Sequence, residues 1–249
     1  MKTEHISDAM NHLDEDLLEE TQAVRVRKKH GHSWMKWTAA AACLAVALGV
    51  GIPMAVRQGN RIELSGNSVN VTARYTNRAP ATTTGDQVVY MTEEELFTAF
   101  NTAAFRGTVT KIENIELDFN GQKNYRAIAE IAVEEVYRGP CAAGDTVTVL
   151  LPCPVNEEVT SENEIAAAMR EGMAGIFMPI IYDDTSIRQE NGATLMLKDI
   201  ADYGLADGSR FTFLETADGL LFSREAYRSI ADTATLDEVE EYIRRMIAE

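Results

Sequence analysis

The chain has 249 residues, and its 39 aspartates and glutamates outnumber its 23 lysines and arginines, which gives a formal net charge of −16. Almost all of this excess lies after residue 36, because the first 36 residues hold six basic and seven acidic side chains. An acidic surface repels phosphate backbones, so the composition argues against nucleic acid as a partner.

All four histidines lie in the first 36 residues, at His5, His12, His30 and His32. The rest of the chain therefore lacks the imidazole that a Ser/His/Asp triad, a Cys/His pair or a histidine zinc site requires. Acidic residues are so numerous that chance carboxylate pairs are expected, and no local motif selects two of them. The sequence predicts a non-enzymatic protein with no catalytic residues, no cofactor and no metal site.

The first predicted element is an amphipathic helix over residues 6–26. Its apolar positions recur at spacings of three and four residues, and they are Ile6, Met10, Leu13, Leu17, Thr21 and Val24. The N-terminal tail of 36 residues is too short to form a core that could bury this stripe. The stripe is therefore predicted to bind a cytoplasmic protein partner through Ile6, Met10, Leu13, Leu17 and Val24. Self-association is an alternative, and binding along an anionic membrane surface is disfavoured by the acidic polar face.

The second predicted element is a membrane-spanning helix at residues 37–56, which are 20 consecutive residues without a charge. A helix of that length is about 30 Å long, the thickness of the hydrocarbon layer. Trp34 and Trp37 lie at its N-terminal edge and basic residues are concentrated before it, so the N-terminus is expected in the cytoplasm and the bulk outside. A cleaved signal peptide is one alternative, and the long charged leader before the segment argues against it. A buried helix of a soluble domain is the other, and the absence of a polar stripe argues against that.

The third predicted segment is a linker at residues 57–89, which are rich in Asn, Thr, Ser and Gly. Within it, residues 62–75 are expected to pair weakly as a hairpin. The predicted organisation is a cytoplasmic tail at 1–36, the span at 37–56, the linker at 57–89 and an extracytoplasmic domain at 90–249.

The extracytoplasmic domain is predicted to be α+β. Three capping boxes, at Thr92 to Glu95, Ser161 to Glu164 and Thr235 to Glu238, predict helices. Strands are predicted over 105–115, 125–137, 146–151, 174–181, 195–199, 210–215 and 219–223, with tight turns at Asn120-Gly121 and at 216–218. Strands so close in sequence, with helices at the edges, favour a mostly antiparallel, partly open barrel.

Cys141 and Cys153 are the only cysteines beyond the span. They flank the predicted strand 146–151, so a disulfide requires the neighbouring loops to bring their Cα atoms within about 7 Å. One disulfide and two free buried thiols are the two alternatives that the sequence leaves open.

Two local resemblances add to these patterns. The segments FRGTV at 105–109, IAVEEVYRG at 131–139 and GDTVTV at 144–149 resemble the first three strands of OB-fold domains related to tissue inhibitors of metalloproteinases. This resemblance implies an OB-like barrel. It does not imply inhibition, because the inhibitory wedge of that family needs a free N-terminal cysteine pinned by disulfides.

The second resemblance covers residues 6–56. The run ISDAMNHLDEDLLEET at 6–21, the WMKW at 34–37 and the Ala-Cys-Leu span are similar to the N-termini of single-pass proteins of Clostridia-type Firmicutes that are described as anti-sigma factors or surface proteins. The resemblance implies a sigma factor as the cytoplasmic partner. Zinc-type anti-sigma domains use a His-x3-Cys-x2-Cys cluster, and since residues 1–36 contain no cysteine, any such contact would use the helix alone.

Two functions of different classes are consistent with this organisation. In the first, a membrane-anchored signalling protein senses an exterior ligand and holds a cytoplasmic regulator. In the second, the exterior domain is a surface module that binds a saccharide, peptide or protein, and the N-terminus only anchors it. Phe105, Tyr125 and Tyr137 are candidates for lining such a binding face, although aromatic side chains in strands more often belong to the core.

Overall fold

The computed structural model describes residues 60–78, 80, 90–155 and 164–248. The predicted helix at 6–26 and the predicted span at 37–56 lie outside these residues. Among the residues described, no helix is both long enough and apolar enough to cross a membrane. Residues 57–249 form one compact unit of the chain, and the fold below is that of its described part.

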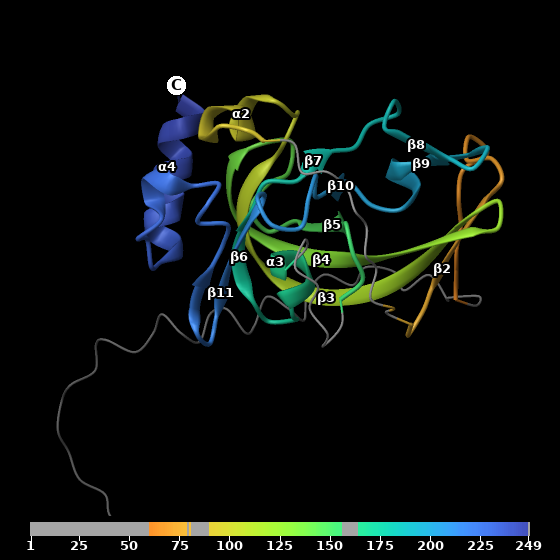
Figure 1. Cartoon of the computed structure of the whole chain (residues 1–249), viewed down its shortest axis with the longest axis horizontal. Coiled ribbons are helices and arrows are strands. Elements are labelled where there is room, and N and C mark those ends of the chain that lie inside the picture. Colours follow the sequence, from red (N-terminus) through yellow and green to blue (C-terminus); the bar gives the residue numbers. More distant parts are fainter. Residues whose placement is uncertain (1–59, 79, 81–89, 156–163, 249) are drawn as a thin grey trace, which may run out of the picture. The chain divides into compact units, whose positions relative to one another are not determined.

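The described unit is mostly β-structure with few helices, consistent with α+β (Figure 1). In the described part of the chain, ten strands share one sheet: β1 Arg61–Ile62, β2 Val71–Tyr75, β3 Ala104–Phe119, β4 Gln122–Arg138, β5 Thr146–Leu151, β6 Ala174–Phe177, β7 Ile180–Ile181, β10 Tyr203–Gly204, β11 Thr212–Thr216 and β12 Gly219–Leu221. A second small sheet pairs β8 Ile187–Glu190 with β9 Ala193–Met196. The helices are α2 Glu93–Thr98, α3 Glu164–Ala168 and α4 Leu236–Ala248, with 3-10 turns η4 Leu197–Asp199 and η5 Arg228–Ile230.

The large sheet curls into a half-barrel. Strand β3 pairs with β4 on one side and with β6 on the other, β4 pairs with β5, and β5 pairs in parallel with β10. Strand β10 then pairs with β7, which follows β6 after only Met178 and Pro179. Proline donates no backbone hydrogen bond, so the ladder breaks there and the chain bends from one neighbour to the other.

Several predicted elements are confirmed. The capping boxes at Thr92 to Glu95 and Thr235 to Glu238 begin α2 and α4, and Asn120 and Gly121 both have positive φ in the β3–β4 turn. The segment predicted as a strand at 195–199 is corrected, because β9 ends at Met196 and residues 197–199 form the turn η4. Residues 161–163, which open the remaining capping box, lie outside the described residues.

One predicted boundary is also corrected. The hairpin predicted within residues 62–75 is confirmed, because β1 pairs with β2. The segment is not a linker, however, since β2 also pairs along its whole length with residues 115–119 of β3. Ala73 of β2 is 1% exposed in an apolar cluster. The many polar side chains of this segment face outward, and hydrogen bonding to β3 makes it a strand in spite of its composition.

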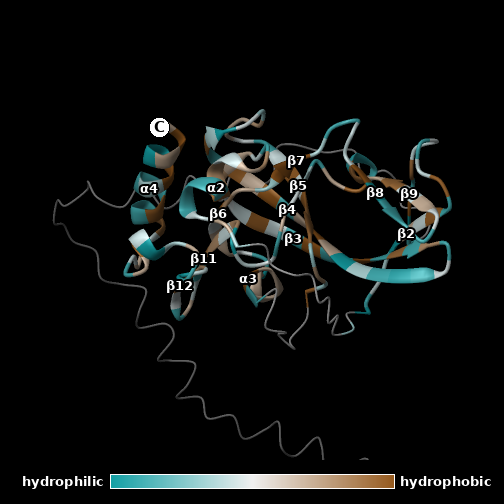
Figure 2. Cartoon of the chain, turned by 45° about the horizontal axis from the view of Figure 1, so that its top comes forward, coloured by the Kyte–Doolittle hydropathy of each residue, from teal (hydrophilic) through white to brown (hydrophobic). Residues whose placement is uncertain are grey.

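The long hairpin of β3 and β4 connects two hydrophobic cores. Phe105, Val109 and Ile131 lie in the larger core, beneath α2, α3 and α4. Ile115, Leu117 and Phe119 lie in the smaller one, where β2, β9 and η4 cover the outer half of the hairpin. Figure 2 shows apolar colour mainly along the half of the hairpin that lies in the larger core, while the outer half is mostly hydrophilic in colour. One hairpin therefore sets the relative positions of both ends of the domain.

Glu116 fixes β2 to this hairpin. Its carboxylate is 3% exposed and accepts hydrogen bonds from Arg74 of β2 at 2.7 Å, from Lys123 at 3.1 Å and from Tyr125 at 3.0 Å. Burial alone would raise the pKa of Glu116, but the hydrogen bonds from Lys123, Tyr125 and Arg74 outweigh it and hold the pKa below its ordinary value. The charged form is therefore the one that the fold stabilises.

We predict that Glu116→Gln lowers the free energy of unfolding at neutral pH by about 1–3 kcal/mol, because it removes charge-assisted hydrogen bonds from a buried group. The stabilisation by Glu116 is present above its unfolded-state pKa of about 4.3 and is lost as the pH falls through its lower folded-state pKa. Denaturant unfolding of the full-length chain in detergent, from pH about 3 to about 7, measures both effects.

The matched control is Glu135→Gln. Glu135 lies on the same hairpin, but it is 47% exposed and pairs with an exposed Arg244. Its loss is expected to change the unfolding free energy by less than about 1 kcal/mol. Equal losses for the two variants would contradict a special role of Glu116.

Candidate functional site

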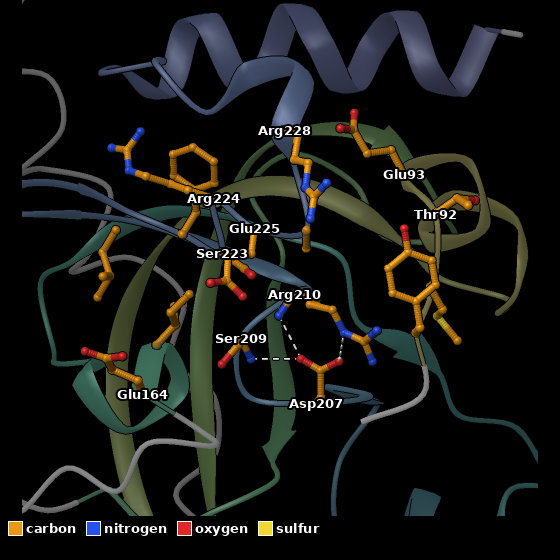
Figure 3. Close-up of a pocket in the computed structure, with 16 residues that line it drawn as sticks. Thr92, Glu93, Glu164, Asp207, Ser209, Arg210, Ser223, Arg224, Glu225 and Arg228 are labelled. Atoms are coloured by element: carbon orange, nitrogen blue, oxygen red, sulfur yellow. Dashed lines mark hydrogen bonds and ion pairs between the residues drawn. The ribbon is translucent and has the colours of Figure 1, made fainter. Parts of the chain in front are cut away.

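An open groove of about 1100 Å³ lies beside α2, α3 and the segment from β12 to η5 (Figure 3). Its apolar lining includes Ile165 and Phe222, which are 4% and 5% exposed. Tyr90 lies at the groove with 81% of its surface exposed. Charged side chains from four separate parts of the chain complete the lining: Glu93, Glu164, Asp207, Arg210, Arg224, Glu225 and Arg228.

Asp207 organises one wall of the groove. Its carboxylate accepts hydrogen bonds from the backbone N–H of Ser209 at 2.8 Å and of Arg210 at 2.7 Å, and from Arg210 Nε at 2.7 Å. The buried Tyr227 donates its hydroxyl to the Arg210 carbonyl at 2.6 Å. Asp-Gly-Ser at 207–209 is a typical turn sequence, in which an aspartate accepts from the next backbone amides. The guanidinium of Arg210 is thus already paired.

Glu93 ties the first turn of α2 to the opposite wall. It accepts from the Ser229 backbone N–H at 2.9 Å, from the Ser229 hydroxyl, and from the Tyr242 hydroxyl at 2.8 Å. Burial tends to raise the pKa of Glu93, and the hydrogen bonds from Ser229 and Tyr242 outweigh it, so the pKa lies below the ordinary value. Glu93 is therefore ionised and holds α2, η5 and α4 together.

The side chain of Arg224 is also engaged in contacts within the fold. Its guanidinium lies 4.6 Å from the centre of the Phe222 ring and donates to the carbonyl oxygens of Ala231 and, at 3.3 Å, Thr233. These contacts close the loop that carries η5. Arg224 and Arg210 thus shape the groove but have few donors left for a ligand.

Three charged groups of the groove remain available. The side chains of Glu164, Glu225 and Arg228 are exposed and form no hydrogen bond or ion pair with any residue that the structure describes. Figure 3 shows Arg228 pointing into the groove toward the Asp207–Arg210 pair. A guanidinium offers several donors in a planar fork that matches a carboxylate, while the two glutamates accept hydrogen bonds from amines or hydroxyls. The groove therefore provides both kinds of polar partner over an apolar floor.

The residues singled out from the sequence do not meet at this site. Phe105 is fully buried in the larger core, the Tyr125 hydroxyl bonds to Glu116, and the Tyr137 ring packs under Arg244. These three aromatic residues therefore do not form a common binding face. The predicted partner-binding positions Ile6, Met10, Leu13, Leu17 and Val24 lie outside the described residues.

Cys141 and Cys153 are free thiols in the structure, so no disulfide joins them. Cys153 is buried, and burial raises its pKa to about 11. Cys141 is half-buried, and burial likewise raises its pKa. Among the described residues, no group of three or more potential metal ligands is found.

We predict that Asp207→Ala lowers the free energy of unfolding by about 1–3 kcal/mol, because it leaves two backbone amides and Arg210 without their acceptor. Arg228→Ala is the matched variant in the same groove, and its effect should stay within about 0.5 kcal/mol because its side chain bonds to none of the described residues. Thermal and denaturant unfolding of the full-length chain compare the two. A large loss on Arg228→Ala would mean that this side chain stabilises the fold.

Comparison with protein-family models, with curated proteins and with solved structures finds no match for this chain. A function must therefore be argued from the residues of the groove and from the organisation of the chain. The groove combines a guanidinium and two carboxylates that pair with no described residue, an exposed tyrosine and an apolar floor.

Proposed function

We propose that this chain is a membrane-anchored, non-catalytic signalling protein whose exterior domain binds a ligand in the groove beside α2 and η5. The uncharged segment 37–56 serves as the span, with the N-terminus in the cytoplasm and the domain outside the cell membrane. The amphipathic helix in the tail binds a cytoplasmic regulator, for which a sigma factor is our candidate. Binding of a ligand to the exterior domain changes the affinity of the cytoplasmic helix for that regulator.

The observation that carries this proposal is that Arg228, Glu164 and Glu225 have no partner among the described residues, in a groove whose other charged groups are fixed. Side chains that stabilise the fold are paired here, whereas these three bond to nothing in the part of the chain that the structure describes. A peptide segment suits them, because it offers carboxylate or carbonyl oxygens to Arg228 and N–H groups to the two glutamates. The apolar floor and Tyr90 can accept one of its side chains.

We further infer that the domain is an OB-like barrel. Three features support this: the β3–β4–β5 meander, the helix α3 between β5 and β6, and the β10 strand that returns beside β5. OB-folds commonly bind ligands with the loops after their first and fourth strands. In this chain those loops bond to each other, since Asn120 Nδ2 donates to the Asn191 carbonyl at 3.3 Å and Asn191 Nδ2 donates to the Asn120 carbonyl at 3.1 Å. This contact favours the groove as the ligand site.

The test separates the two halves of the proposal in the native host. Leu13→Asp combined with Leu17→Asp is expected to abolish co-purification of the cytoplasmic partner with the full-length chain and to change the transcripts that the partner controls, because two charges break the apolar stripe. Arg228→Ala is expected to keep the partner bound but to lose the response to the exterior signal. Affinity capture and transcript profiling measure both.

Glu19→Gln is the control for the tail, because Glu19 lies on the predicted polar face and should change neither readout. Unchanged capture and unchanged transcripts in the Leu13 and Leu17 variant would refute the signalling role. The exterior binding module with a simple anchor would then be the better account, provided that Arg228→Ala still impairs function.

A further inference from the structure

A second surface of the domain is also without a partner in the described structure. Besides Tyr90 at the groove, the large hydrophobic side chains that stand exposed in the described part of the chain are Val69 and Ile187, at 52% and 48%. Both belong to the β8–β9 region. They lie on a different part of the domain from the groove.

Strand register puts Val69 and Ile187 on one face. Val69 pairs with Thr194 of β9, and Ile187 of β8 pairs with Met196 of β9. Ala193 and Leu195 alternate with these positions and are buried in the smaller core, so Val69, Ile187 and the half-buried Met196 lie on the opposite face, together with the polar Thr194 and Gln189. Val69 and Ile187 are two strand spacings apart and offset by two residues along the strands, which separates them by about 12 Å. We call Val69, Ile187 and Met196 the apolar patch.

The chain enters the domain at this same end. Figures 1 and 2 both show β2, β8 and β9 at the end of the domain opposite α4. The first described residue, Asn60, accepts a hydrogen bond from the Tyr75 N–H at 2.6 Å, and β1 starts at Arg61. The entry point is therefore bonded to the C-terminal end of β2. Val69 lies six residues before Tyr75, about 20 Å away along the strand.

The length of chain before this point limits where the domain can be. The uncharged segment ends at Val56, and the four peptide links from Val56 to Asn60 reach at most about 14 Å. If residues 37–56 span the bilayer, which is the proposal above on which this inference rests, the first strand starts within that distance of the membrane surface. A long flexible linker between span and domain is excluded, because β1 and β2 belong to the sheet.

We infer that the apolar patch docks on the outer surface of the lipid bilayer, with Val69, Ile187 and Met196 inserted at the level of the headgroups. Three side chains are too few for a stable protein interface, which typically uses about 20–30 residues on each side. They suffice for a tethered domain, because a short tether gives a high effective concentration at the membrane and a weak contact is then occupied. The groove, at the α4 end, is thereby held away from the lipid.

The test incorporates the photo-crosslinking amino acid benzoylphenylalanine into the full-length chain at Val69, at Ile187 or, as the control, at Glu241. Glu241 is an exposed position of α4, at the opposite end of the domain. Each protein is reconstituted in phosphatidylcholine vesicles and irradiated, and adducts are identified by mass spectrometry. Lipid adducts are expected at positions 69 and 187 and none above background at 241, also when part of the lipid is phosphatidylglycerol.

Alkaline extraction of the same vesicles distinguishes this inference from the proposed span. A chain that resists extraction but forms no lipid adduct at 69 and 187 overturns the docking and leaves the span intact. Crosslinks from these positions to a second copy of the chain also overturn it, because the patch would then be a self-association surface. A chain that is extracted refutes the span, and the docking inference falls with it.

Discussion

The β3–β4 hairpin is the constraint on which the domain depends. Its two strands, of 16 and 17 residues, are too long to be covered by one core, and each half is buried in a different apolar cluster. At Gly107, which lies among the register shifts of β3, an added Cβ would lie 2.9 Å from Ile131 Cγ2 and would collide with the Ala132 carbonyl. Close backbone approach at this bulge lets the hairpin curl into the half-barrel.

Because one hairpin passes through both cores, it connects the end of the domain that forms the groove with the end at which the chain enters. At one end α2, η5 and α4 are joined through Glu93 and form the groove. At the other end β1 and β2 receive the chain from the N-terminus, and Arg74 is paired with the buried Glu116 of the hairpin. Any change in the groove that shifts β3 would thus act on the strand that leads toward the proposed span.

The inclusion of residues 61–75 in the sheet alters the functional argument. A domain on a loose linker of more than thirty residues could sample many orientations, and an event in its groove would have no defined route to the proposed span. Strand β1 starts five residues after the uncharged segment and pairs with β2, which is bonded to β3, and this connection provides such a route. Coupling across a membrane requires an element with defined arrangements at both ends, and β2 is the segment in a position to provide it.

The sequence by itself determined the local features. The capping boxes at Thr92 and Thr235, the turn at Asn120-Gly121 and the positions of the long strands follow from hydrogen bonds and backbone preferences within a few residues. The parallel pairing of β5 with β10, the recruitment of β2 and the groove were decided by tertiary structure alone. Each of these depends on residues more than 40 positions apart, such as Arg74 with Glu116, and local periodicity contains no information about which distant strand or charge will be the partner.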